Sequence, residues 1–404
     1  MTIVIVGGGH AAGQAAASLR QENYDGAILV IGEEPHIPYQ RPPLSKQYLA
    51  GEYGLERVHL RPARFYDSKD IAVRRGVRVE AIDRDAQTVS CSDGTDVGYD
   101  KLLLATGARP RKLDTPGNDL PGIHYLRTIA DVDAIKADFR PGRRVAIVGG
   151  GYIGLEVAAV ATEAGLNVTV LEMEDRILKR VTTPTMSAFY QEIHSEKGVA
   201  VRTGMRAESF AGTDRLTGVV CAGGEVVPAD VAVVGIGIQP NVELAAAAGL
   251  DCDDGIVVDE HTRTSDPNIF AAGDCTNHPN PVLGRRLRLE SVPNAMEQSR
   301  VAASNLAGKA KAYANVPWFW SDQYELKLQM VGFATEAERQ VVRGDPGTRR
   351  FAVFYFDGDT LVAADAVNSP REFMAARQLV GKAVDPGKLA DPGVDLRTVL
   401  QATQ

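Results

Sequence analysis

Residues 3–33 read IVIVGGGHAAGQAAASLRQENYDGAILVIGE, which is an apolar run, a glycine turn, a small-residue segment and a second apolar run. This order predicts a strand, a tight turn, a helix ending near Arg20 and a second strand. Gly7 permits the turn, Gly9 lets the backbone approach a pyrophosphate, and Ala12 keeps the helix close to the sheet. The N–H groups at the helix start can bind phosphates. The stretch therefore predicts a dinucleotide-binding fold, with an ordinary glycine-rich turn as the alternative.

Acidic residues close this stretch and a second one like it. Glu33 lies 26 residues after Gly7, where a carboxylate can accept a hydrogen bond from an adenosine ribose. Residues 145–154, VAIVGGGYIG, repeat the glycine turn at an offset of 142, with the complete fingerprint Gly149, Gly151 and Gly154. Glu172 ends the next apolar run and should repel a ribose 2′-phosphate, which predicts NADH rather than NADPH. Arg176 and Lys179 follow and weaken that expectation slightly.

A second repeat supports duplication. Residues 100–110 read DKLLLATGARP and residues 230–240 read DVAVVGIGIQP, at an offset of 130. Each segment predicts a buried strand that ends in a glycine turn. This offset is 12 residues smaller than the offset of 142 between the glycine turns. A proline-rich loop, residues 35–46, that is absent from the second copy would account for the difference. We therefore predict an α/β fold with two nested Rossmann-type domains, the second copy inserted in the first.

The repeats and a change in composition at Trp318 define the expected domains. These are a discontinuous first dinucleotide domain (1–112 and 243–317), a second one (113–242) and a C-terminal α+β domain (318–404). In the last, residues 351–356 and 360–367 are expected to form a hairpin. The segment Ser369 to Glu372 is expected to be a capping box that starts a helix ending near Gly381.

Composition narrows the function classes. The 404 residues are 44% hydrophobic and 24% charged, which is typical of a soluble globular chain. No apolar run approaches the ~20 residues that span a bilayer, and a strand within three residues of the start leaves no room for a signal peptide, so a cytoplasmic location is expected. The net charge of −8 argues against nucleic-acid binding. Widely spaced cysteines predict no metal site and inert thiols: Cys91, Cys221, Cys252 and Cys275.

Three further segments carry candidate site residues. In the loop at residues 35–46 the prolines should hold Arg41 and Lys46 in place, although a solvated loop with incidental bases is an alternative. Gly273-Asp274 ends a short buried strand. The segment from Ser291 to Gln298 is expected to open a helix with Pro293 in its first turn. The positive end of that helix suits an anion such as the reduced flavin, with an ordinary capped helix as the alternative.

Taken together, RPPLSK at residues 41–46, Ala105-Thr106-Gly107, Gly273-Asp274 and WFWSDQ at residues 318–323 resemble one family. It is the FAD-dependent, NADH-using ferredoxin reductases of bacterial cytochrome P450 and ring-hydroxylating dioxygenase systems (putidaredoxin reductase-like). The resemblance implies a glutathione-reductase-like fold. It assigns residues 1–112 and 243–317 to FAD, residues 113–242 to NADH, and a [2Fe–2S] ferredoxin as the partner. A monomer or weak dimer is expected.

The motifs and the resemblance give the expected binding residues. Those for FAD are Gly7, Gly9, Ala11, Ala12, Glu33, Arg41, Lys46, Val79, Ala105, Thr106, Gly107, Arg127, Gly273, Asp274 and Val292. Those for NADH are Gly149, Gly151, Tyr152, Ile153, Gly154, Glu156, Glu172, Gly235, Ile236 and Gly237.

The resemblance also implies residues that act in electron transfer. It places Lys46 and Glu156 as an ion pair beside the flavin N5 and Trp320 beside the flavin ring; a plain salt bridge and a core tryptophan are the alternatives. We further expect the ferredoxin to dock over Trp320, with Arg61 and Arg300 as flanking cations, because an acidic chain needs a local basic patch to meet an acidic partner.

The cysteine positions limit the electron route. Disulfide enzymes of the glutathione-reductase type use a cysteine pair after the first helix, and this chain has no cysteine before Cys91. Electrons should therefore leave the flavin directly for a one-electron carrier that brings its own cluster. A rubredoxin reductase, an NADH oxidase or peroxidase, and an interaction protein of the apoptosis-inducing-factor type remain alternatives.

Overall fold

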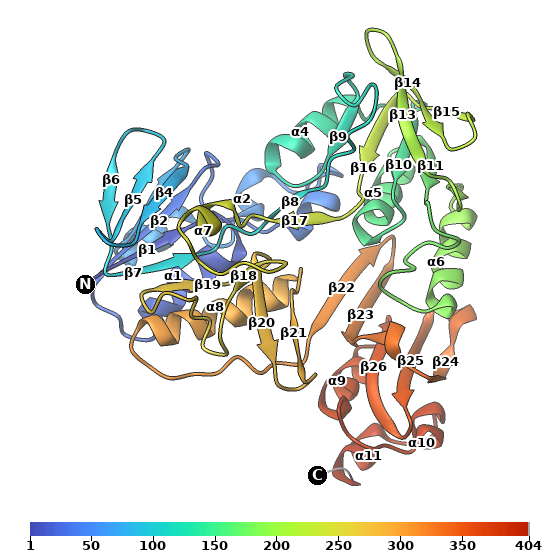
Figure 1. Cartoon of the computed structure of the whole chain (residues 1–404). Coiled ribbons are helices and arrows are strands. Elements are labelled where there is room, and N and C mark those ends of the chain that lie inside the picture. Colours follow the sequence, from blue (N-terminus) through green and yellow to red (C-terminus); the bar gives the residue numbers. More distant parts are fainter. Residues whose placement is uncertain (403–404) are drawn as a thin grey trace. The chain divides into compact units, whose positions relative to one another are not determined.

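The computed structural model describes residues 1–402, apart from the side chain of Glu336 (Figure 1). The chain forms two compact units. Unit 1 comprises residues 1–41, 53–109 and 238–317. Unit 2 comprises residues 42–52, 110–237 and the chain from Trp318 onward.

Unit 1 is built on a parallel sheet in the order β19-β7-β1-β2-β3. Its strands are β1 (Thr2–Val6), β2 (Ala27–Gly32), β3 (Ile71–Arg75), β7 (Lys101–Leu104) and β19 (Ile269–Ala271). Val4 pairs with Leu29 on one side and with Leu102 on the other. Because helices cover a parallel sheet, its central strands read as continuous apolar runs rather than alternating ones. The strands predicted from residues 3–33 and 100–110 are confirmed, whereas β3 was not predicted.

Small residues bring two helices of unit 1 together. Helix α1 (His10–Gln21) packs against α8 (Val292–Leu306) through buried alanines that include Ala15 and Ala302. The shorter helices are α2 (Leu55–Val58), α3 (Ala63–Ser68) and α7 (Glu243–Ala247), with the 3₁₀ helix η1 (Pro42–Ser45) in unit 2. Further strands complete unit 1. An antiparallel sheet contains β4 (Val79–Asp83), β5 (Thr88–Cys91) and β6 (Asp96–Gly98). A third sheet has the order β18-β20-β21, formed by β18 (Ile256–Val257), β20 (Thr276–Asn280) and β21 (Arg285–Leu287), and β8 (Ala108–Pro110) pairs with β17 (Ile238–Pro240).

Unit 2 repeats this plan in a parallel sheet of order β12-β11-β10-β16-β9. The strands are β9 (Ile123–Tyr125), β10 (Arg144–Val148), β11 (Asn167–Leu171), β12 (Ala200–Arg202) and β16 (Val231–Val234). Helices α4 (Ile129–Asp138), α5 (Tyr152–Glu163) and α6 (Pro184–Glu196) and the antiparallel strands β13 (Ala207–Gly212), β14 (Leu216–Cys221) and β15 (Val226–Pro228) accompany it. The order β7-β1-β2-β3 matches β16-β10-β11-β12, which confirms the predicted duplication.

The two copies differ where the sequence suggested. Residues 33–70 connect β2 to β3 and contain the proline-rich loop with η1. The equivalent connection from β11 to β12, residues 172–199, is shorter and contains α6 instead. The loop is therefore peculiar to the first copy.

The rest of unit 2 is an antiparallel sheet with helices (Figure 1). Its order is β22-β23-β26-β25-β24, formed by β22 (Trp318–Gln323), β23 (Leu326–Gly332), β24 (Arg339–Asp345), β25 (Arg350–Asp357) and β26 (Thr360–Val367). The accompanying helices are η2 (Ala334–Glu336), η3 (Pro346–Thr348), α9 (Pro370–Leu379), α10 (Pro386–Ala390) and α11 (Leu396–Ala402). The predicted hairpin and the end of α9 before Gly381 are confirmed.

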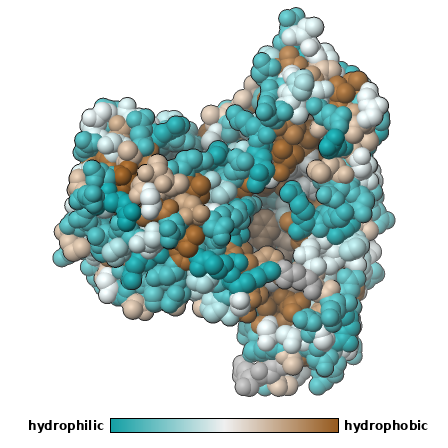
Figure 2. Space-filling view, viewed as in Figure 1, coloured by the Kyte–Doolittle hydropathy of each residue, from teal (hydrophilic) through white to brown (hydrophobic). Residues whose placement is uncertain are grey.

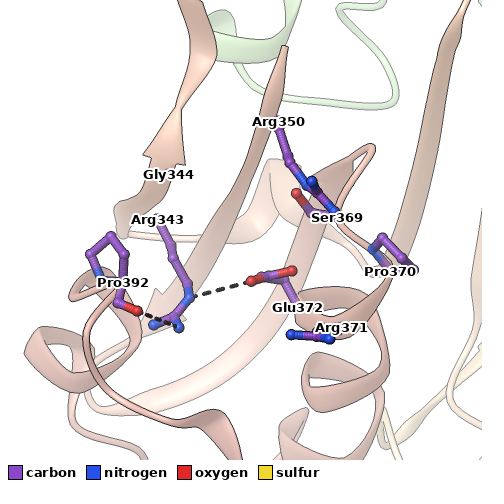
Figure 3. A pocket seen from close by; sticks show the side chains of 8 residues that line it. All are labelled: Arg343, Gly344, Arg350, Ser369, Pro370, Arg371, Glu372 and Pro392. Atoms are coloured by element: carbon purple, nitrogen blue, oxygen red, sulfur yellow. Dashed lines mark hydrogen bonds and ion pairs between the residues drawn. The ribbon is translucent and has the colours of Figure 1, made fainter. Parts of the chain in front are cut away.

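The expected capping box at α9 is wrong. Ser369 occupies the N-cap position but makes no side-chain cap hydrogen bond. Glu372 faces Arg343 instead, with 3.5 Å between Oε1 and Nε (Figure 3). Arg343 is buried and donates to the carbonyls of Asp391 and Val394. A buried guanidinium favours a nearby carboxylate, which explains why Glu372 turns away from the N-cap.

Surface properties are unremarkable for a globular chain. On the face shown in Figure 2, hydrophilic side chains predominate and hydrophobic ones occur in patches. Among residues 1–402 no helix combines the length and apolar character needed to cross a membrane. Within the same residues no group of three or more His, Cys, Asp or Glu side chains could hold a metal ion.

Candidate functional site

The first glycine turn is shaped for close backbone approach. Gly7 has φ +132°, and a Cβ there would lie 2.2 Å from the carbonyl oxygen of Ala105, so only glycine fits. A Cβ at Gly9 would meet no atom within 4 Å, which leaves open space before α1. The first hydrogen bond inside α1 runs from Gly13 N–H to Gly9, so the N–H of Ala12 has no acceptor within the helix. These features fit a pyrophosphate.

The second turn repeats this geometry in unit 2. Gly149 has φ +107°, and its Cβ would lie 2.4 Å from the carbonyl oxygen of Gly235. Gly151 again faces open space, whereas a Cβ at Gly154 would lie 2.2 Å from the carbonyl oxygen of Gly149. The third glycine is therefore needed for packing inside the protein, and the second one for access from outside.

The helix that follows the second turn is partly exposed at its start. Tyr152 is buried and its hydroxyl donates to Sδ of Met330 at 2.7 Å, whereas Ile153 is exposed. Beyond β16, Gly237 has φ +106° and its carbonyl accepts from the N–H of Arg111. Gly235, Ile236 and Gly237 thus form a loop at the carboxyl end of β16, the same edge of the sheet as the glycine turn.

Glu172 lies beside the second turn as predicted from its spacing. Its Oε2 accepts from the N–H of Gly150 at 2.7 Å, and its Oε1 accepts from the N–H of Glu174 at 2.9 Å. These bonds orient the carboxylate at the end of β11. A ribose 2′-phosphate bound there would therefore face the negative charge of Glu172.

The two basic residues that follow are already engaged. Arg176 donates to Ser187 Oγ at 2.5 Å and to the carbonyl of Lys179. Lys179 forms ion pairs with Glu174 at 2.9 Å and Asp175 at 3.3 Å. The charge of Lys179 is therefore offset by two carboxylates, whereas Arg176 donates to neutral oxygens.

The first copy differs at its acidic position. Glu33 is exposed and pairs with Arg78, with 2.9 Å between Oε2 and Nε. Val79, the next residue, begins β4 and is buried. Arg41 is held by Glu34 at 2.7 Å and also donates to the Tyr39 hydroxyl, so the proline-rich loop fixes this guanidinium.

The Ala105–Gly107 turn is tied to a neighbouring segment of unit 1. Thr106 Oγ1 donates to the carbonyl of Asn241 at 2.7 Å, and Asn241 Nδ2 donates back to the carbonyl of Thr106 at 2.9 Å. Gly107 has φ +64°. In unit 2, the N–H of Arg127 donates to the carboxylate of Asp131, next to the start of α4.

Gly273 and Asp274 lie beside α1 and α8. Gly273 has φ +92°, and its Cβ would lie 3.2 Å from that of Ala11. Its N–H donates to Oε1 of Gln298 at 2.8 Å, and Thr276 Oγ1 donates to the same oxygen at 2.9 Å. Gln298 thus joins α8 to the Gly-Asp turn. The sequence analysis missed this role, because no local motif marks Gln298. Val292 begins α8, as expected.

Lys46 and Glu156 form an ion pair inside unit 2. The distance from Nζ to Oε2 is 2.6 Å, and Glu156 is only 2% exposed. Ser45 Oγ donates to the same carboxylate oxygen at 2.5 Å, and Ser321 Oγ donates to the other at 2.7 Å. The two serines were missed from sequence. The place of this pair relative to a flavin stays a prediction.

The predicted docking residues do not all present free surface. Trp320 is half-buried, and with Trp318, Asp322, Lys327 and Gln329 it lines a hollow of about 210 Å³ on unit 2. Arg61 is half-buried in unit 1, where its guanidinium stacks 4.9 Å from the Phe65 ring. Arg300 is exposed on α8. Arg61 is therefore a weaker candidate for a partner contact than Arg300.

The larger cavity, of about 520 Å³, lies elsewhere in unit 2 (Figure 3). Its lining includes Arg343, Arg350, Arg371 and Glu372 but no residue of either glycine turn. The carboxylate of Glu372 already faces one of these arginines. The cavity is therefore separate from the nucleotide motifs.

The cysteines offer no redox pair among the described residues. All four are free thiols, and only Cys252 is exposed. Burial raises the pKa of Cys221, Cys252 and Cys275, which disfavours the nucleophilic thiolate at neutral pH.

Comparison with known proteins identifies the family to which this geometry belongs. A family model for pyridine nucleotide-disulphide oxidoreductases matches residues 1–299, and one for the reductase C-terminal domain matches residues 318–400. Rhodocoxin reductase of Rhodococcus erythropolis is 45% identical over 403 residues, 99% of this chain and 94% of the relative. The ferredoxin–NAD(+) reductase component of the anthranilate 1,2-dioxygenase system of Burkholderia cepacia is 48% identical, with 98% of both chains covered. The covalent putidaredoxin reductase–putidaredoxin complex matches with a TM-score of 0.96 and 43% identity, covering 100% of this chain and 98% of that one.

The duplicated glycine turns, the sheets that carry them and these matches define a glutathione-reductase-like oxidoreductase, a class for which FAD and NAD(P)H are implied. Within it, the chain belongs to the pyridine nucleotide-disulphide oxidoreductases that are ferredoxin reductases of cytochrome P450 and ring-hydroxylating dioxygenase systems. The predicted family is confirmed.

Proposed function

We propose that this NAD(P)H-dependent ferredoxin reductase binds FAD at the first glycine turn and NADH at the second, and reduces a [2Fe–2S] ferredoxin. The observation that carries the proposal is the pair of turns, in which Gly9 and Gly151 both face open space at a helix N-terminus. The solved complex of a related reductase with its putidaredoxin supports the partner. Residues 1–112 and 243–317 would form the FAD domain, and residues 113–242 the NADH domain.

When bound, FAD supplies the chemistry of accepting a hydride and releasing electrons singly. This chain's residues would hold and orient the two nucleotides. The N–H groups that begin α1 and α5 would bind the pyrophosphates, and Glu172 would accept a hydrogen bond from the ribose hydroxyl of NADH. Lys46 would present its ammonium to the flavin, and its ion pair with Glu156 would orient that ammonium.

The choice of NADH rests on charge. Glu172 is held beside the second turn, and the nearby Lys179 is paired with two acids. A carboxylate close to a phosphate costs about 1 kcal/mol in water and several at low effective dielectric. A ribose 2′-phosphate beside Glu172 would meet this cost.

Acceptor screening tests the proposal. Purified protein should release FAD, not FMN, on heating, and should reduce a [2Fe–2S] ferredoxin with NADH anaerobically. Rubredoxin and dioxygen serve as competing acceptors in parallel assays. Turnover with rubredoxin or dioxygen that exceeds turnover with every ferredoxin, or a protein that binds no flavin after reconstitution with FAD, would overturn the proposal.

A further inference from the structure

A chain of buried side chains leads away from Glu156. Ser321 Oγ lies 2.7 Å from Glu156 Oε1 and 3.2 Å from Gln323 Nε2. Gln323 Oε1 lies 2.9 Å from His194 Nε2, and His194 Nδ1 lies 3.2 Å from the Tyr324 hydroxyl. Glu156, Ser321, Gln323 and His194 are each at most 2% exposed. All belong to unit 2.

The donors in this chain all point toward Glu156. An ionised carboxylate only accepts, so the single proton of Ser321 goes to Glu156 and the serine oxygen accepts from Gln323 Nε2. The amide oxygen of Gln323 then accepts from His194 Nε2–H. Burial lowers the pKa of His194 and raises that of Tyr324 to about 12, so a neutral imidazole can accept from a protonated phenol. This network fixes both the amide orientation and the tautomer.

Strand alternation explains how one segment serves two purposes. Side chains on β22 point to alternate faces, so Trp318, Trp320 and Asp322 line the hollow described above. Ser321 and Gln323 point the other way and are buried, and β22 packs against α5, the helix that carries Glu156. Ser321 and Gln323 therefore take part in the network that leads to Glu156, whereas the two indoles line the hollow.

We propose that Ser321, Gln323 and His194 are positioning residues that hold the Glu156 carboxylate correctly oriented against Lys46. The inference rests on the proposed function of the Lys46–Glu156 pair in flavin reduction. Burying a carboxylate is costly unless donors replace the lost water. Lys46 and Ser45 donate to Oε2 of Glu156, and Ser321 donates to Oε1. Polarised chains of this kind strengthen each bond in them.

The test compares FAD-loaded variants of the full chain. Ser321→Ala removes the donor, Ser321→Thr keeps a hydroxyl, and Glu156→Gln removes the charge that the chain serves. Ser195→Ala is a matched control, because Ser195 adjoins His194 but its hydroxyl donates only to the carbonyl of Gln191. The readouts are FAD content, the rate of flavin reduction by NADH in anaerobic stopped flow, and the flavin midpoint potential.

We expect Ser321→Ala to slow flavin reduction about tenfold, the usual scale for one hydrogen bond to a charged group. The midpoint potential should move in the same direction as in Glu156→Gln. Ser321→Thr should restore most of the rate, and Ser195→Ala should match the unmodified protein. In the Glu156→Gln background, Ser321→Ala should cause little further loss, because the two changes act through the same carboxylate.

Two results separate the possible failures. A normal rate and potential in Ser321→Ala, with Glu156→Gln impaired, would overturn the positioning role alone. A normal rate in Glu156→Gln would overturn the proposed function of the ion pair and this inference with it. If Ser321→Ala does not load FAD, Gln323→Met replaces it, since this variant keeps the side-chain shape but removes both hydrogen bonds. An unchanged rate in Gln323→Met would equally contradict the proposal.

Discussion

At the scale of single residues, Asp365 provides a pH-dependent test of packing in unit 2. The carboxylate is buried on β26 and accepts from Thr182 Oγ1 at 2.5 Å and from the Tyr355 hydroxyl at 2.9 Å. Burial raises its pKa to about 6 despite these bonds. In the unfolded chain the pKa is about 3.9. The folded state therefore holds an extra proton between these values, and its stability falls as the pH rises from about 4 to 6.

Asp365→Asn should abolish this loss of stability at higher pH, because the amide is neutral and its oxygen can still accept from both hydroxyl donors. We expect the free energy of unfolding at pH 8 to rise by about 3 kcal/mol, with little change at pH 4. Thermal or urea unfolding of the FAD-loaded protein at several pH values measures this. Asp359→Asn, at an exposed position, is the control. A lower stability at pH 8 in Asp365→Asn would show that the charged form is favoured.

Substitution of Glu172 tests the predicted preference for NADH over NADPH. Glu172→Gln removes the charge and keeps an oxygen for the N–H of Gly150. The ratio of kcat/KM for NADH over NADPH should fall about tenfold, in line with the loss of one close carboxylate–phosphate repulsion. Asp214→Asn, at an exposed acid elsewhere in unit 2, is the control. Equal use of both coenzymes by the unmodified protein would show instead that Arg176 and Lys179 dominate.

The contacts of single residues were the hardest feature to predict from the sequence. Glu172 was identified because its spacing from Gly149 is set within one strand–turn–helix–strand unit. Ser321 meets Glu156 across 165 residues of chain, and Gln298 meets Gly273 from another element. Such contacts depend on how elements pack, so no local spacing could have indicated them.

At the scale of elements, the glycines of the second turn have separable roles. A Cβ at Gly151 would meet no protein atom, whereas one at Gly154 would collide with the Gly149 carbonyl. Gly151→Ala should therefore keep the FAD content and the melting temperature but raise the KM for NADH by about tenfold, because the methyl group fills space meant for a phosphate. Gly154→Ala should lower the stability instead. Steady-state kinetics and thermal melts separate the two, and an unchanged KM in Gly151→Ala would exclude the turn from NADH binding.

Arg300, an exposed residue in the middle of α8, provides a test of the ferredoxin contact. Arg300→Glu should depress ferredoxin reduction much more than ferricyanide reduction and flatten its salt dependence, since rim charges act mainly on association rates. Arg397→Glu changes the net charge equally at a distant place in the sequence and is the control. Equal effects on both acceptors, or none, would move the docking surface away from α8.

At the scale of the whole molecule, electrons should pass without any thiol. Replacing all four cysteines with Ser or Ala should leave NADH-to-ferricyanide turnover within severalfold, because three are buried and none is paired. FAD content and circular dichroism check that the variant folds. Lost turnover in a folded, FAD-loaded single variant would contradict a direct route from the flavin.

The architecture was largely predictable at this scale, because duplicated motifs at two offsets imply duplicated sheets. The C-terminal hairpin and its helix also followed from local patterns. The edge strand β3 did not, since its side chains alternate poorly and it owes its form to pairing with β2. The capping box failed because a buried arginine from β24 attracted its glutamate.

The uneven exposure of the cysteines also gives the native protein a convenient chemical handle. Cys252 lies at the surface of unit 1, while Cys91, Cys221 and Cys275 are buried. A maleimide dye should therefore attach once per chain without engineering, faster at mildly alkaline pH because burial and the neighbouring Asp251 raise the pKa of this thiol. Fluorescence from that single position could then follow ferredoxin binding in real time.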